Sequence, residues 1–167
     1  MLNAIVCVDN NWSIGKDNDL LFSLPKDMNY FKIMTSNSIV VCGRKTLDSF
    51  PGGKPLKNRS TICLCSKEHN RDDCYCVNNF EDALKLVKEL SKTKDVWIIG
   101  GQSIYSLFLE HTDRVYVTKV KANGGGTVFF PNLDTNSNFR VKSVAGIQED
   151  SGYEISFWIY ERIKRSA

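Results

Sequence analysis

The chain has 167 residues, of which 42% are hydrophobic and 25% are charged, as is typical of a globular domain with a substantial core. Its 22 Lys and Arg residues against 19 Asp and Glu residues leave a net charge of +3, scattered along the sequence, which argues against nucleic-acid binding. No apolar run reaches the length of a membrane span. We therefore expect one domain over residues 1–167, with neither nucleic acid nor membrane as a partner.

The N-terminus and the cysteines bear on the compartment. Residues 1–4 lack the basic region and the cleavage site of a signal peptide, so we expect a cytoplasmic protein. Two Cys-x-Cys pairs make a zinc site one possible interpretation, but zinc motifs usually space their cysteines more widely. The better interpretation is no metal and reduced, mostly buried thiols. The six cysteines are Cys7, Cys42, Cys63, Cys65, Cys74 and Cys76.

The first predicted strand covers residues 2–8, which are almost continuously apolar, as in a parallel strand buried on both faces. Residues 12–22 follow with little periodicity. A loop of this length in a compact domain is usually functional or disordered, and its apolar residues argue against disorder. We expect a lid that packs on a ligand.

Residues 23–32 predict a helix, with Pro25 in its first turn. Spacing of three and four residues places Leu24, Asp27, Met28 and Phe31 on one face. An acid within an apolar stripe is costly unless it has a partner. Asp27 is therefore either a helix-dipole contact at the N-terminus or a carboxylate poised to bind or protonate a polar ligand.

Two further buried strands are predicted at residues 38–42 and 59–65, and polar or basic residues follow each of them. Gly43 and Arg44 follow the first, and Ser66 and Lys67 the second. This pattern is compatible with a phosphate site or with a solvated helix start, and on its own it is a weak signal. Residues 50–58 predict a loop, and residues 75–77 a short strand.

Residues 81–92 predict an amphipathic helix, and residues 96–99 a fifth buried strand. Gly100 and Gly101 come next and open another helix, so that a ligand can approach the backbone closely. The ordinary Gly-x-Gly-x-x-Gly dinucleotide fingerprint is absent.

Residues 114–120, 139–144 and 153–160 predict the closing strands, with a turn near residues 150–152. The whole pattern predicts an α/β fold: a mainly parallel central sheet of about eight strands, flanking helices and an antiparallel C-terminal strand. Ligands of such sheets bind beyond the carboxyl ends of the strands. We expect Asp27, Arg44, Ser66, Gly100 and Thr118 to converge there.

These motifs, in this order and spacing, resemble dihydrofolate reductase along the whole chain, and the short length resembles the bacterial form. The matching stretches are Ile14-Gly15, Leu24-Pro25-x-Asp27-x-x-x-Phe31-Lys32, Gly43-Arg44-x-Thr46, Arg59, Ser66, Ile99-Gly100-Gly101, Tyr105, Thr118 and Thr127-x-Phe129-Phe130-Pro131.

The resemblance implies reduction of 7,8-dihydrofolate to tetrahydrofolate by hydride from NADPH. Asp27 would hold the pterin and promote protonation of N5, and Thr118 would orient Asp27. The implied catalytic residues are Asp27, Phe22, Tyr105 and Thr118. The implied substrate-binding residues are Ile5, Cys7, Asp27, Met28, Phe31, Lys32, Phe50, Leu56, Arg59, Ile99 and Thr118. Arg59 would bind the α-carboxylate of the glutamate tail.

The resemblance also implies a site for NADPH, antifolate inhibitors as further ligands, and a monomer. The implied cofactor-binding residues are Val6, Cys7, Ile14, Gly15, Leu20, Gly43, Arg44, Lys45, Thr46, Ser49, Cys65, Ser66, Lys67, Ile99, Gly100, Gly101, Gln102, Ser103, Ile104, Tyr105 and Thr127.

The chain departs from the family pattern at two positions. Phe22 stands where the family commonly has Trp, and Ser103 where many relatives have Arg. Two other functions remain open: a related NADPH-dependent pyrimidine reductase of riboflavin synthesis and an inactive nucleotide-binding module. Both are disfavoured by the complete set of Asp27, Phe31, Arg59, Thr118 and Gly100-Gly101.

Overall fold

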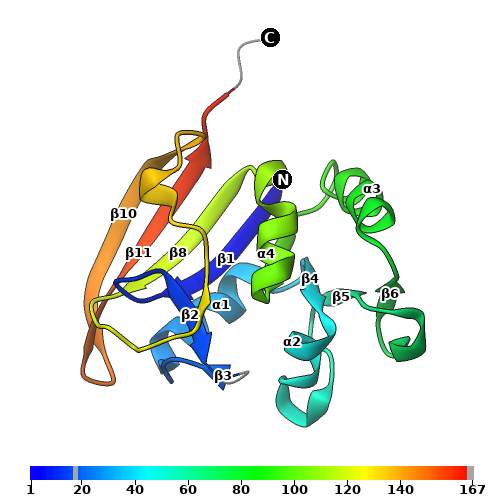
Figure 1. Cartoon of the computed structure of the whole chain (residues 1–167), viewed down its shortest axis with the longest axis horizontal. Helices are drawn as coiled ribbons and strands as arrows, with labels where there is room; N and C mark the ends of the chain where they lie inside the picture. The colour runs from blue at the N-terminus through cyan, green and yellow to red at the C-terminus, as the bar shows by residue number, and fades with distance from the viewer. Residues whose placement is uncertain (17–18, 165–167) are drawn as a thin grey trace.

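The computed structural model describes residues 1–16 and 19–164. Its larger sheet has eight strands in the order β10-β11-β8-β1-β7-β4-β5-β6 (Figure 1). These strands are β1 (Leu2–Val8), β4 (Ile39–Gly43), β5 (Ser60–Leu64), β6 (Tyr75–Val77), β7 (Val96–Gly100), β8 (Arg114–Val120), β10 (Phe139–Asp150) and β11 (Tyr153–Arg162). All pairs from β8 to β6 are parallel, whereas β11 is antiparallel to β8 and β10. The predicted α/β fold is confirmed.

Helices cover both faces of the sheet; in Figure 1, α4 lies in front of it and α1 behind it. The helices are α1 (Pro25–Thr35), α2 (Arg44–Asp48), α3 (Phe80–Leu90) and α4 (Gln102–Phe108). Successive residues of a strand point to opposite faces, so each buried strand contributes to two layers of core. Val6 and Ile98 pack with Phe108 on the α4 side, and Ile5 and Trp97 belong to the cluster on the other side.

The predicted helix at residues 81–92 is α3, which begins one residue earlier and ends two residues earlier. Asn79 precedes it, and the Asn79 side chain accepts a hydrogen bond from the backbone N–H of Asp82 at 2.9 Å. This cap fixes where the helix begins. The predicted turn after β10 is also present: Ser151 and Gly152 have φ of 53° and 85°, and Asp150 pairs with Tyr153.

Two regions differ from the prediction. Residues 12–22 contain two short strands, β2 (Ser13–Lys16) and β3 (Asp19–Leu20), which form a second sheet with β9 (Val128–Phe129). Such short strands lack enough residues to show a period. β10 runs to Asp150, whereas the sequence predicts its end at residue 144. It is the edge strand of the sheet, and most of its side chains are exposed. Apolar alternation therefore does not mark it.

The six cysteines are free; Cys42, Cys63 and Cys65 are buried, and the other three are partly exposed. Within residues 1–16 and 19–164, no cluster of His, Cys, Asp and Glu is arranged to hold a metal ion. None of the helices in these ranges is long and apolar enough to cross a membrane.

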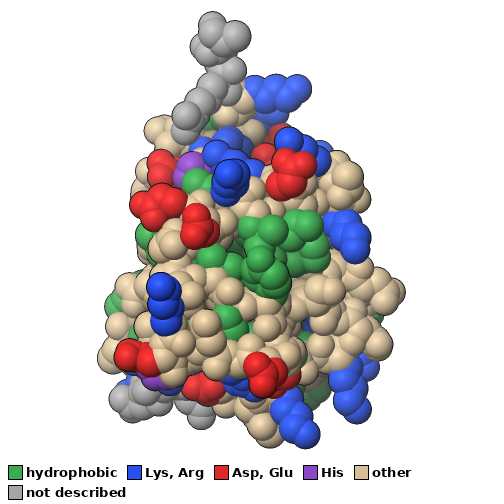
Figure 2. All heavy atoms as spheres, turned by 90° about the vertical axis from the view of Figure 1, so that its right-hand side faces the viewer, with side chains coloured by type: hydrophobic (Ala, Val, Ile, Leu, Met, Phe, Trp, Pro, Cys, Tyr) green, Lys and Arg blue, Asp and Glu red, His purple; other side chains and the backbone are tan. Residues whose placement is uncertain are grey.

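On the α3–β6 side of the molecule, charged groups surround a central hydrophobic patch (Figure 2).

Candidate active site

Asp27 lies in the first turn of α1 and is half-buried beside β1 and β8. The Thr118 hydroxyl donates a hydrogen bond of 2.6 Å to Asp27 Oδ1. Cys7 is paired with Thr118 in the β1–β8 ladder, and its side chain also contacts Asp27. Three elements that are far apart in the sequence thus meet at one carboxylate, and two of its neighbours, Thr118 and Cys7, are among the predicted site residues.

Burial is the main influence on this carboxylate. It raises the pKa of Asp27, because a charge is less well solvated there than in water. Hydrogen bonds from Thr118 and Cys7 act in the opposite direction, and the negative charge of Asp150 raises the pKa further. Burial also raises the pKa of the Cys7 thiol far above its ordinary value, so that Cys7 is neutral beside Asp27.

An apolar wall lies next to Asp27. The predicted substrate-binding residues Ile5 and Ile99 are buried in one cluster, and Phe31, Phe50 and Leu56 pack against it. The predicted stripe on α1 is buried unevenly, since Leu24 is 2% exposed and Met28 is 58% exposed. Lys32 is exposed on the same helix. This face of α1 therefore keeps apolar surface open next to the carboxylate.

Arg59 lies beside the C-terminal half of α1. Its Nη1 donates to Thr35 Oγ1 at 3.1 Å, and its guanidinium carbon lies 5.8 Å from the centre of the Phe31 ring. A further hydrogen bond from Nε to the Lys57 carbonyl oxygen holds the guanidinium in place. Partial burial lowers the pKa of Arg59, which nevertheless stays a cation. The structure brings Arg59 next to Phe31, two residues that the resemblance assigns to the substrate site.

Two strand-to-helix junctions meet on the other side of the site. A Cβ placed on Gly43, at the end of β4, would lie 3.2 Å from Ile104, and one on Gly101 would lie 3.5 Å from Thr46 Oγ1. Gly100 has φ of +120°, a conformation that favours glycine. The Tyr105 hydroxyl donates to the Ile5 carbonyl oxygen at 2.7 Å and thus ties α4 to β1. Burial raises the pKa of Tyr105.

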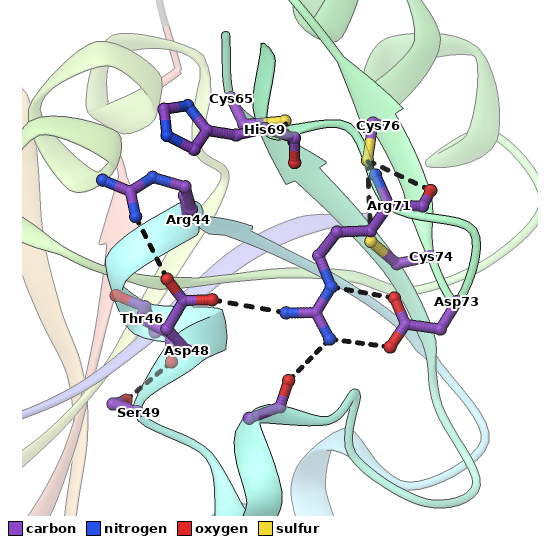
Figure 3. A network of polar contacts seen from close by, with 11 residues as sticks. Arg44, Thr46, Asp48, Ser49, Cys65, His69, Arg71, Asp73, Cys74 and Cys76 are labelled. Atoms are coloured by element: carbon purple, nitrogen blue, oxygen red, sulfur yellow. Dashed lines mark hydrogen bonds and ion pairs between the residues drawn. The ribbon is translucent and has the colours of Figure 1, made fainter. Parts of the chain in front are cut away.

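Charged side chains form a network beyond these junctions (Figure 3). Arg44 pairs with Asp48 at 3.2 Å, and Asp48 also pairs with Arg71 at 3.3 Å. Arg71 is held in turn by Asp73 at 2.7 Å. Ser66, which follows β5, lies 2.6 Å from His69 Nδ1. Arg44 and Ser66 therefore lie on neighbouring parallel strand ends, as predicted.

The remaining predicted cofactor residues are distributed around the two junctions. Lys45, Lys67, Gln102 and Ser103 are exposed, and the Ser49 hydroxyl donates to the Thr46 carbonyl oxygen at 2.6 Å. Cys65 is buried directly after β5. Val6 is 7% exposed and packs in the core on the α4 side, so its side chain is turned away from the Asp27 face.

The segment before α1 packs against the end of the sheet. Gly15 accepts a hydrogen bond from the Thr127 N–H at 2.9 Å and thereby links β2 to the chain before β9. Ile14 is partly buried, and Leu20 is 71% exposed. The Phe22 ring meets the Tyr153 ring edge-on, with centroids 4.9 Å apart. A Cβ on Gly124 would lie 2.9 Å from Phe22, so Phe22 also packs against that backbone.

Two acids in this region are absent from the sequence prediction. The Asp9 carboxylate accepts hydrogen bonds from the N–H groups of Asn11 and Ser13 and, from the distant chain, of Gly124. Asp150 accepts hydrogen bonds from the N–H groups of Lys26 and Asp27. The position of Asp9 directly after a predicted buried strand is the one sequence feature that could have indicated a role at this edge of the sheet. No local pattern indicates the contact of Asp150.

The chain is similar to known proteins along nearly its whole length. The family model described as dihydrofolate reductase matches residues 1–162. The dihydrofolate reductase of Bacillus subtilis (strain 168) is 34% identical over 97% of this chain and 95% of its own length. That of Staphylococcus haemolyticus is 34% identical over 98% and 96%, and that of Mus musculus is 33% identical over 96% and 97%.

A solved structure shows the same fold. It is the dihydrofolate reductase from Enterococcus faecalis complexed with NADP(H) and RAB-propyl, with a TM-score of 0.88 and 27% sequence identity. The match covers 98% of this chain and 97% of that chain. Sequence and structure comparisons therefore agree over nearly the full length.

Proposed function

The chain belongs to the dihydrofolate reductase family and is an NADPH-dependent oxidoreductase that reduces 7,8-dihydrofolate to tetrahydrofolate, and we propose that Asp27 is the residue around which its active site is built. The product serves one-carbon metabolism. The comparisons do not favour a pyrimidine reductase of riboflavin synthesis. We propose one such domain over residues 1–167.

The observation that supports the role of Asp27 is its half-buried carboxylate between Thr118 and an apolar wall. A carboxylate in such a place lacks the water that would otherwise solvate it, so binding partners that carry N–H groups are favoured. The amino group and ring N–H of a pterin have this chemistry. Thr118 holds the carboxylate in one orientation, and Ile5, Phe31 and Ile99 cover the ring faces.

Asp27 also promotes proton delivery to N5 of the substrate. Its raised pKa keeps a proton available nearer to neutral pH than an exposed aspartate would. An intervening water carries the proton, because the carboxylate binds the other edge of the pterin. When bound, NADPH supplies the hydride for C6. Tyr105 contributes by holding the Ile5 backbone at the junction between the two halves of the site.

The residues at the two glycine junctions fit NADPH. Gly43 packs tightly against the Ile104 side chain, and Gly101 lies in ordinary contact with Thr46, so the two strand-to-helix junctions lie against each other. Glycines between a strand and a helix leave the backbone N–H groups of the helix start accessible to an anionic group of a ligand. Arg44, Ser66 and Lys67 would hold the 2′-phosphate end, and the segment from Gly100 to Tyr105 the pyrophosphate and nicotinamide end. Ile14, Gly15, Leu20 and Thr127 would cover the cofactor from the lid.

Arg59 would bind the α-carboxylate of the glutamate tail, with Lys32 nearby on α1. Its guanidinium is fixed by Thr35 and Lys57 and retains further N–H donors, which suits a planar carboxylate. Antifolates that present a similar ring to Asp27 are expected ligands of the same pocket. We further propose a cytoplasmic monomer that acts on small molecules and binds neither nucleic acid nor membranes.

Loss of NADPH absorbance on addition of dihydrofolate tests the activity. Gel filtration with light scattering tests the proposed monomeric state. We expect turnover with dihydrofolate and none with the pyrimidine substrate of riboflavin synthesis. Turnover of the pyrimidine alone would overturn the assignment.

A further inference from the structure

The N-terminus of α1 lacks a cap of its own. Its N-cap residue is Leu24, which makes no side-chain cap hydrogen bond, and Pro25 occupies the first helical position. The next backbone N–H groups, those of Lys26 and Asp27, have no partner within the helix and need one elsewhere. This is the turn that carries the carboxylate of the active site.

Asp150 supplies the missing cap from the far end of the chain. Its Oδ2 accepts the Lys26 N–H at 2.9 Å and the Asp27 N–H at 3.4 Å, across 124 and 123 residues of sequence. Asp150 is the last residue of β10 and is only 4% exposed. A carboxylate at this end of a helix is also favoured by the helix dipole.

Further contacts hold the end of the hairpin against α1. The Lys26 ammonium donates to the Glu149 carbonyl oxygen and so joins α1 to the hairpin. Within the turn, the Ser151 hydroxyl lies 3.2 Å from Asp150 Oδ1 and helps to orient that carboxylate. Tyr153, on the other side of the turn, packs on Phe22 just before the helix. The β10–β11 turn and the residues next to it therefore contact the chain on both sides of the α1 N-terminus.

We propose that Asp150 is a positioning residue for the reaction, which sets the N-terminus of α1 so that Asp27 meets Thr118 and which acts on Asp27 through its charge. The inference rests on the proposed role of Asp27. If the cap is lost, the first turn of α1 can shift, and the 2.6 Å hydrogen bond between Thr118 and Asp27 no longer defines one orientation.

The electrostatic part of the proposal follows from the groups that face Asp27. Cys7 comes from β1, Tyr30 from the next turn of α1, Tyr105 from α4 and Asp150 from β10. The thiol and the two phenols have raised pKa values and stay neutral near neutral pH, and Lys26 is turned to the Glu149 carbonyl oxygen. Asp150 is thus a charged group whose removal should make Asp27 ionise more easily.

Three variants separate charge from geometry. Asp150→Asn keeps an oxygen that accepts the two N–H groups but removes the charge. Asp150→Ala removes both. Glu149→Gln is the matched control, because it removes one negative charge from the neighbouring, exposed position without touching the cap. Thermal unfolding of each variant checks that it is folded.

The first measurement is the pH dependence of single-turnover hydride transfer. We expect Asp150→Asn to move the profile to lower pH with its acid plateau retained, and Glu149→Gln to leave the profile in place. Asp150→Ala should lower the plateau itself by about tenfold, as expected for a lost hydrogen bond that positions the acid. If the profile of folded Asp150→Asn coincides with that of the wild type, the proposal is overturned.

The second measurement is an NMR titration of the Asp27 carboxyl carbon in the protein without ligand. It reports the coupling to Asp150 whether or not the enzyme reduces dihydrofolate. We expect the Asp27 pKa to fall in Asp150→Asn and to stay unchanged in Glu149→Gln. An inactive wild type would count against the proposed function, whereas an unchanged titration in Asp150→Asn would count against this inference.

Discussion

Thr118 Oγ1 lies 2.6 Å from Asp27 Oδ1 and joins β8 to α1 across 91 residues of sequence. Thr118 is 1% exposed, so its hydroxyl has few other partners, and the contact is a fixed part of the sheet edge. The hydrogen bond is charge-assisted, which makes it one of the stronger polar contacts of a protein. It orients a carboxylate whose charged form burial destabilises.

Asp27→Asn should lower the rate of hydride transfer by about a hundredfold or more at neutral pH, as expected for loss of a group that promotes proton transfer. The substitution keeps the shape and the acceptor for Thr118 and removes the acid. Single-turnover kinetics with dihydrofolate and NADPH measure it. Asp72→Asn, at an exposed position, is the control. Full activity of Asp27→Asn would show that another residue promotes protonation.

The wild-type rate should fall as pH rises through the pKa of Asp27, since the protonated acid becomes scarce. The same shift affects stability. Because the folded state raises the pKa of Asp27, its favourable contribution is complete below the ordinary aspartate pKa and is lost as pH rises through the raised value. Asp27→Asn should therefore be more stable than the wild type at neutral pH, by on the order of 1 kcal/mol.

Urea unfolding at neutral and at acid pH tests this prediction. The stability difference between Asp27→Asn and the wild type should shrink as the pH is lowered, because the wild-type carboxyl then becomes neutral as well. A difference that is the same at both pH values would mean that packing, and not the charge of Asp27, separates the two proteins.

Arg44→Leu should reduce the preference for NADPH over NADH. A charge-assisted contact with the 2′-phosphate is worth about 1.5–3 kcal/mol, which corresponds to about 10- to 150-fold in affinity. Folding should be little affected, since the Arg44–Asp48 pair is exposed. The ratio of kcat/KM for the two cofactors measures the effect. Lys54→Leu removes a nearby exposed cation and should leave this ratio unchanged. Equal use of both cofactors by the wild type would refute the assignment.

Arg59→Leu should raise the KM for dihydrofolate by about tenfold or more and leave the KM for NADPH nearly unchanged. The guanidinium contacts Thr35 and Phe31 of α1, where we propose that the glutamate tail binds. Lys57→Leu, which removes an exposed cation two residues away, is the control. If both KM values rise together in Arg59→Leu, the residue acts on folding or on the whole cleft.

The buried parallel strands could be predicted because a strand that is covered on both faces consists almost entirely of apolar residues. Residues 2–8 and 96–99 are examples, and the order of strands and helices then limits the topology. The small sheet of β2, β3 and β9 could not be predicted, because strands of two to four residues carry no detectable period. β10 was seen only in part, since an exposed edge strand needs no apolar alternation.

The residues of the candidate site also differ in whether the sequence alone indicates them. Asp27 stands out as an acid within an apolar stripe, and Gly43, Arg44 and Ser66 stand out as they follow predicted strands. Asp150 has no such signal. Its two hydrogen bonds to α1 depend on the length of the β10–β11 hairpin and on the twist of the sheet that brings the turn to the helix. Contacts of this kind arise only from tertiary structure.

The last prediction concerns Phe22, where the family commonly has Trp. An indole N–H can hold an ordered water, whereas a phenyl ring cannot donate a hydrogen bond. A water in a polar niche needs two to four partners, and Asp27 with the nearby backbone can supply the others. One lost neutral hydrogen bond is worth about 0.5–1.5 kcal/mol, so Phe22→Trp should speed hydride transfer by about tenfold or less.

The packing of Phe22 limits this gain. Its ring meets Tyr153 edge-on, and the Gly124 backbone lies against it, so a larger indole must move one of them. Phe22→Leu is the control, because it keeps an apolar side chain without a donor and should be slower than the wild type through lost packing. Single-turnover hydride transfer compares the three proteins. A gain above about a hundredfold in Phe22→Trp, near 2.7 kcal/mol, would show that Phe22 marks a compromised active site and would overturn the view that it is a tolerated variant.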